Sequence, residues 1–106
     1  MALQKTITRK GIELSYHNIC NVVINKNNTS CVIRHYANAD ARAESENNNV
    51  FKTSISFPNR DTEGNEVTAP DLDSLKSDGA SPHVEVYSIL KANAFDDVDL
   101  SGATDI

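Results

Sequence analysis

The sequence predicts an α+β domain that is mainly β: an antiparallel sheet of about five strands with one C-terminal helix. Three observations predict it. Residues 19–36 contain two apolar runs separated by a polar tip, residues 50–57 alternate between apolar and polar side chains, and residues 82–92 carry an apolar stripe at helical spacing. The first two patterns have the period of strands, and the third has the period of a helix.

The chain opens with residues 3–9, which are rich in β-forming side chains. Lys10-Gly11 breaks that run, and Ile12, Leu14 and Tyr16 then alternate with polar residues. We therefore predict a strand, a turn at Gly11, and a second short strand that leads into residues 19–36.

Residues 19–36 predict a β-hairpin with Asn27-Asn28 as a two-residue loop, because Asn tolerates the left-handed backbone of such turns. This register places Lys26 opposite Thr29. One face of the hairpin is then almost wholly apolar, and a slip by one residue would scatter it over both faces. Its expected cross-strand pairs are Cys20 with His35, Val22 with Ile33, and Ile24 with Cys31.

The other face of this hairpin is mixed, and it is the candidate interface with a partner protein. Exposed apolar side chains commonly mark such contacts. The alternative is that the N-terminal strand of the same chain covers this face. The candidate interface residues are Ile19, Val23, Val32, Arg34 and Tyr36.

Residues 37–49 contain no large apolar side chain and predict an exposed arm or loop, with a helical turn capped by Asn38 or Asp40 as the alternative. Residues 50–57 predict the clearest half-buried strand, with Phe51, Thr53, Ile55 and Phe57 on its inner face. A long polar stretch follows, in which a hairpin around Glu63-Gly64-Asn65 is plausible.

Ser81-Pro82 predicts a helix start, with Ser81 as the N-cap and Pro82 in the first turn. Val86, Ile89 and Leu90 form the stripe expected to pack on the apolar face of the sheet. For the acidic tail there are two alternatives: Val98 and Leu100 anchor it to the core by packing, or the tail is loose. The predicted single domain, residues 1–106, thus comprises a β-sheet (2–57), a polar excursion (58–80), a helix (82–92) and an acidic tail (95–106).

Composition narrows the partners of this chain. Its formal charge of −5 disfavours nucleic acid, which requires clustered Lys and Arg. No apolar run approaches the roughly 20 residues that span a bilayer, and the first residues lack the apolar core of an export signal. With 39% apolar and 6% aromatic residues and no Trp, the core is expected to be thin and aliphatic. We therefore expect a cytoplasmic product that completes its burial as a homo-oligomer, a dimer or trimer.

The residues capable of soft-metal or nucleophilic chemistry are few: Cys20, Cys31 and the histidines at positions 17, 35 and 83. Their spacing matches no zinc motif, and the expected register keeps the two cysteines apart as free, buried thiols. Cys20 opposite His35 is the one pair that geometry could bring together, and no orienting group is evident beside it. We therefore predict no enzyme, no catalytic residue, no cofactor and no metal.

The two ends of the chain resemble a known group of proteins. The resemblance rests on Lys5-Thr6-Ile7-Thr8, Gly11, residues 16–19, residues 87–91 and Phe95-Asp96-Asp97. These segments are similar to small proteins encoded among the structural genes of tailed phages and prophages of Gram-positive bacteria. The resemblance implies a virion or virion-assembly component of the head, neck or tail, made in the host cytoplasm, with other virion proteins as partners. The alternative function is a soluble cytoplasmic module that binds a host protein or a small ligand.

Overall fold

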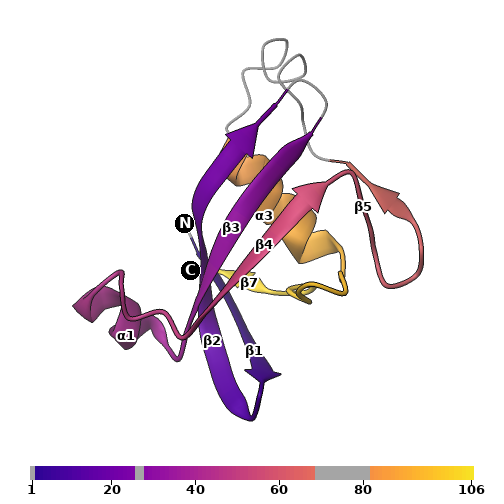
Figure 1. Ribbon diagram of the computed structural model, residues 1–106. Helices are drawn as coiled ribbons and strands as arrows, with labels where there is room; N and C mark the ends of the chain where they lie inside the picture. The colour runs from indigo at the N-terminus through magenta and orange to yellow at the C-terminus, as the bar shows by residue number, and fades with distance from the viewer. Residues whose placement is uncertain (1, 26–27, 69–81) are drawn as a thin grey trace.

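The computed structural model describes residues 2–25, 28–68 and 82–106, and shows a five-stranded antiparallel sheet with a helix against one face (Figure 1). The strand order is β4-β3-β2-β1-β7, and a separate two-stranded hairpin, β5-β6, follows β4. The elements are β1 Leu3–Arg9, β2 Ile12–Ile24, β3 Thr29–Tyr36, α1 Ala39–Glu44, β4 Phe51–Phe57, β5 Asn59–Arg60, β6 Glu66–Val67, α3 Pro82–Ala92 and β7 Thr104–Asp105.

The predicted mainly β class with a five-stranded antiparallel sheet is confirmed, but two strands differ from expectation. Residues 12–24 form one strand of 13 residues in place of two short ones. Tyr16 pairs with Gln4 of β1 and with Tyr36 of β3, so β2 carries a partner on both sides where a break was expected. The fifth strand is β7, from the tail, which pairs with the start of β1.

The predicted hairpin register is wrong in two respects. Next to the turn the pairing is shifted by two residues, because Val22 pairs with Cys31 in place of Ile33 and Ile24 pairs with Thr29 in place of Cys31.

A bulge in β2 shifts the pairing by one further residue. Ile19 pairs with Ile33 and Asn21 pairs with Val32, which leaves Cys20 as the extra residue. A bulge reverses the facing of the residues on either side of it. Cys20 is therefore exposed in place of facing His35, and Ile19 is buried on the inner face.

The turn of this hairpin is also shifted relative to the predicted one. Ile24 pairs with Thr29, and the Asn25 amide donates to the Asn28 carbonyl at 2.7 Å. Thr29 therefore lies opposite Ile24, where Lys26 was expected. Lys26 and Asn27 lie outside the described residues.

α3 packs its buried stripe on the inner face of the sheet, as predicted. Val86 and Leu90 are fully buried, and Ile89 is partly buried against the same core. Tyr87 is buried as well, and its hydroxyl oxygen accepts the Ile19 amide at 2.7 Å, beside the bulge. The core that they join also contains Leu3, Cys31, Ile33, Ile55, Phe57, Phe95, Val98 and Leu100. The expected N-cap, Ser81, lies outside the described residues.

Residues 37–49 contain the helical turn that was the alternative to an arm or loop, and most of them are exposed, as expected. Asn38 caps α1, because its side-chain oxygen accepts the Ala41 amide. α1 has no buried residue. The segment is fixed instead by the Glu46 carbonyl, which accepts the Tyr36 hydroxyl at 2.6 Å and Arg34 Nη1 at 3.1 Å.

The tail is pinned, which resolves the alternative left open by its sequence. Val98 and Leu100 are buried, Lys5 Nζ lies 3.2 Å from a carboxylate oxygen of Asp99, and the Gly102 amide donates to the Lys91 carbonyl. The expected hairpin around Glu63-Gly64-Asn65 is present as β5-β6. No helix in the described part of the chain is long and apolar enough to cross a membrane.

Candidate functional site

The structure divides the five predicted interface residues between the two faces of the sheet. Val23, Val32 and Arg34 lie on the outer face, opposite α3, and Val23 is 45% exposed. Ile19 and Tyr36 are buried, so their expected exposure is wrong. The bulge turns Ile19 inward, and the chain's own segment around Glu46 covers Tyr36, which also packs edge-on against Tyr16.

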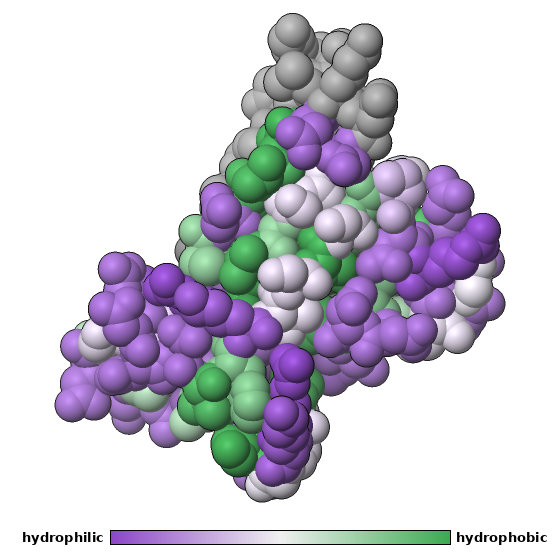
Figure 2. Space-filling view, in the orientation of Figure 1, coloured by the Kyte–Doolittle hydropathy of each residue, from purple (hydrophilic) through white to green (hydrophobic). Residues whose placement is uncertain are grey.

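The outer face is only partly covered. Figure 2 shows green and white side chains over the β2–β4 part of the sheet, between purple groups that belong to α1 and to the β5-β6 hairpin. α1 covers one end of this face. The alternative, cover by the N-terminal strand, does not occur because β1 lies beside β2 in the same sheet.

A polar hollow lies on the outer face between the sheet and the segment after α1. Its volume is about 420 Å³, and its lining residues are Asn18, Ile19, Cys20, Arg34, Arg42 and Glu46. Asn18 and Arg34 are cross-strand neighbours on β2 and β3, and Arg42 comes from the last turn of α1. The back-folding of residues 37–49 therefore brings two arginines to one hollow.

Three buried polar atoms at this hollow have no hydrogen-bond partner: Asn18 Oδ1, Arg34 Nε and Arg42 Nε. The described residues contain two ion pairs, Lys5–Asp99 and Lys91–Asp105, and neither involves these arginines. A hydrogen bond with Tyr36 raises the pKa of Arg34, so its guanidinium stays charged. Buried groups without partners are uncommon in folded proteins and call for an explanation.

A second polar cluster lies on the inner face of the same two strands. His17 and His35 are cross-strand neighbours, both fully buried, with their Nδ1 atoms 2.7 Å apart. His17 Nε2 lies 2.7 Å from the Lys5 carbonyl, and His35 Nε2 lies 2.7 Å from Thr53 Oγ1. Arg9 Nη1 donates to the same Thr53 oxygen at 3.2 Å.

The bonding partners assign the protons of this pair. A carbonyl only accepts, so His17 carries its proton on Nε2 and accepts through Nδ1. His35 must then donate from Nδ1 and accept the Thr53 hydroxyl proton at Nε2. Every polar ring atom is satisfied with both rings neutral. Burial lowers the pKa of His17 and lowers that of His35 to about 4, which keeps the pair uncharged at pH 7.

The cysteines do not join either histidine in a reactive pair. Cys20 is exposed on the bulge, and Cys31 is buried, where desolvation raises the pKa of its thiol to about 11. A thiolate is the reactive form of cysteine, so Cys31 is inert at neutral pH. Sequence reasoning expected Cys20 beside His35; the structure places His17 there.

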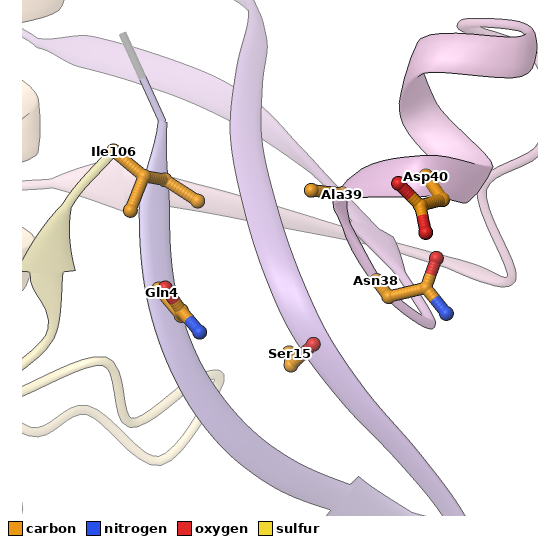
Figure 3. A pocket seen from close by; sticks show the side chains of 6 residues that line it. All are labelled: Gln4, Ser15, Asn38, Ala39, Asp40 and Ile106. Atoms are coloured by element: carbon orange, nitrogen blue, oxygen red, sulfur yellow. The ribbon is translucent and has the colours of Figure 1, made fainter.

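Another hollow, of about 250 Å³, lies where the start of α1 approaches β1 and β2. Figure 3 shows its labelled side chains coming from these elements and from the last residue, Ile106. Two of its polar side chains have partners: Ser15 Oγ donates to the Ala37 carbonyl, and Asn38 caps α1. Among the residues that the structure describes, no three His, Cys, Asp or Glu side chains are grouped to hold a metal ion.

Comparison of the chain with protein-family models, with curated proteins and with solved structures finds no match. The site therefore has to be interpreted from its own geometry.

Proposed function

We propose that this protein is a non-enzymatic component of a tailed-phage particle, or of its assembly, that acts through protein–protein contacts at the head, neck or tail. The resemblance of the two sequence ends supports the particle, and one structural observation supports the mode of action. That observation is the open edge of β4, a strand of seven residues at the end of the sheet.

β4 pairs with β3 along its whole length, from Phe51 opposite His35 to Phe57 opposite Thr29. Within the described ranges, no strand pairs with its other edge. An unpaired edge presents backbone N–H and C=O groups that a strand of another chain can bind. The outward side chains Ser54 and Ser56 are small and exposed, so they leave room for a second strand to approach.

The partner that we propose for the open edge of β4 is a second copy of this chain. Antiparallel pairing of the same strand from two copies generates a two-fold axis, which is the commonest symmetry of homo-oligomers. This geometry favours a dimer over a trimer. Val23 and Val32 lie on the same outer face and extend the contact, while other virion proteins bind the remaining surface.

Mass spectrometry of purified particles from the source tests the proposal. We expect peptides of this chain at a stoichiometry comparable to that of other minor structural proteins. Their absence from particles, with the protein present in the infected-cell lysate, would contradict the proposal.

The second candidate function is a soluble cytoplasmic module that binds a host protein or a small ligand. The hollow lined by Arg34 and Arg42 favours this function, because the Nε donors of both arginines have no partner among the described residues and can bind a ligand. Detection of the protein in lysates but not in particles would support this second candidate.

A further inference from the structure

We propose that Arg34 and Arg42, with Asn18 beside Arg34 in the same hollow, form an oxyanion site that binds a carboxylate. The proposal does not depend on the virion function: the carboxylate belongs either to a small acid or to an acidic side chain of a second copy. No role for this hollow follows from the sequence motifs.

Two positive charges share the site, and neither forms an ion pair with a described residue, although Glu46 lies close enough to interact electrostatically with Arg34. Arg34 projects from β3 and Arg42 from α1, and both line the same hollow. No carboxylate lies within 4.0 Å of either guanidinium in the described part of the chain. Like charges in one hollow repel, and an anion bound between them removes that repulsion.

Two of the three unpaired atoms are donors of the kind that a carboxylate requires, and the third, Asn18 Oδ1, is an acceptor. Arg34 Nε and Arg42 Nε are both buried without an acceptor. A guanidinium presents its Nε–H beside an Nη–H, in a planar fork that matches the two oxygens of a carboxylate. Asn18 contributes its side-chain amide, which donates or accepts according to its rotation about χ2.

The arginine on the sheet is held in place before any ligand arrives. Arg34 Nη1 donates to the Glu46 carbonyl at 3.1 Å, and the same carbonyl accepts the Tyr36 hydroxyl at 2.6 Å. These bonds fix the guanidinium and leave its Nε–H for the hollow. A pre-positioned donor loses little conformational entropy on binding.

The local charge favours a carboxylate over a phosphate. Glu46 also lines the hollow, and the whole chain carries a formal charge of −5. A phosphate brings a charge of about −1.5 to −2 at neutral pH. A carboxylate group places one negative charge between the two arginines and Glu46, and the second carboxylate of succinate then lies outside the hollow. A phosphate group places its whole charge beside Glu46.

The side-chain Nε–Hε signals of arginine in nitrogen-15 NMR spectra report directly on the unpaired donors. We expect succinate, added at low ionic strength, to shift the signals of Arg34 and Arg42 together. Arg60 is the internal control, because it lies on β5 and its Nη1 is bonded to the Gly64 carbonyl. Sodium chloride at matched ionic strength controls for screening, and inorganic phosphate tests the class of anion.

The Arg42→Gln variant removes one guanidinium from a helix that has no buried residue, so the fold should be retained. We expect succinate to bind it at least tenfold more weakly, while Arg60→Gln, with the same change of charge, binds as the wild type. As a second readout, succinate should slow the alkylation of Cys20, which lines the hollow, by iodoacetamide.

The proposal is overturned if Arg34 and Arg42 do not shift, if Arg60 shifts as much as they do, or if phosphate binds more tightly than succinate. Light scattering identifies the source of the carboxylate. Loss of self-association in Arg42→Gln, but not in Arg60→Gln, assigns it to a second copy; succinate binding with unchanged self-association assigns it to a small acid. Absence of the protein from particles would contradict the virion function and leave this site unaffected.

Discussion

The His17–His35 pair and the Arg34–Arg42 hollow lie on opposite faces of the same two strands, and they differ in how their polar atoms are used. On the inner face each ring nitrogen has a partner at 2.7 Å. On the outer face three buried atoms have none. A closed network holds strands together, because removing one member leaves another unpaired in a dry core. Polar atoms without a partner, such as those of the outer hollow, can instead form hydrogen bonds with a ligand.

The first prediction breaks the closed network. His17→Leu leaves His35 Nδ1–H without an acceptor and the Lys5 carbonyl without its donor. We expect a loss of about 2–4 kcal/mol in the free energy of unfolding, measured by urea denaturation. The double variant His17→Leu/His35→Leu removes both partners, and it should lose less than the sum of the two single variants. Additive losses would show that the two rings do not act as a unit.

The second prediction uses pH to charge the same pair. Both histidines have a pKa lowered from the ordinary 6.5, that of His35 to about 4. Between these values the unfolded chain binds more protons than the folded one, so stability rises with pH there. The stabilisation is complete above pH 6.5 and is lost as pH falls towards 4, by on the order of 3 kcal/mol. Urea denaturation at a series of pH values measures it.

The neutral pair already carries one proton on each ring, and a further proton on His17 would place two Nδ1–H groups opposite each other across 2.7 Å. The His17→Leu/His35→Leu variant should therefore show a flatter dependence on pH below 6.5. A slope equal to that of the wild type would assign the effect to the carboxylates of the acidic tail instead.

The third prediction concerns the outer face and its edge. Ser54→Lys/Ser56→Lys places two charges beside the open edge of β4, where both side chains are exposed. We expect the variant to remain folded, within about 0.5 kcal/mol per substitution of the wild type, and to lose self-association in light scattering after size exclusion. Thr62→Lys/Thr68→Lys adds the same charge at exposed positions outside the sheet and should associate as the wild type. A wild-type chain that is a folded monomer at micromolar concentration would refute the oligomer.

On the inner face, the elements could be predicted from the sequence, but the register of β2 against β3 could not. The alternation over residues 50–57 and the stripe over 82–92 were sufficient for β4 and α3, because both patterns are uninterrupted. The register of β2 against β3 was not predictable, since nothing in Ile19-Cys20-Asn21 signals the bulge. His35 was expected on the inner face, and a buried ionisable side chain requires a partner. The expected burial of His35 was therefore the available signal, because it requires a polar partner on a neighbouring strand, where His17 lies.

The outer hollow was less predictable than the inner pair. Its second arginine, Arg42, lies in a segment without a large apolar residue, so no apolar pattern indicates that this segment folds back. The fold-back depends on two bonds to one carbonyl, that of Glu46. Contacts of this kind between a side chain and a distant backbone oxygen leave no periodic trace in a sequence.

The last prediction concerns the hydrogen bond from the Tyr36 hydroxyl to the Glu46 carbonyl, and compares its contribution to stability with that of the histidine pair. Tyr36→Phe removes the hydroxyl that donates to the Glu46 carbonyl and interacts with Arg34, but Arg34 Nη1 still donates to that oxygen, so the carbonyl keeps a partner. The expected loss is about 0.5–1.5 kcal/mol, the net value of one neutral hydrogen bond, and smaller than that of His17→Leu. Tyr16→Phe is the matched control, because Tyr16 packs edge-on against Tyr36 at 5.7 Å. A loss in Tyr36→Phe as large as that in His17→Leu would mean that the outer segment is held by a closed network too, and the contrast between the two faces would fail.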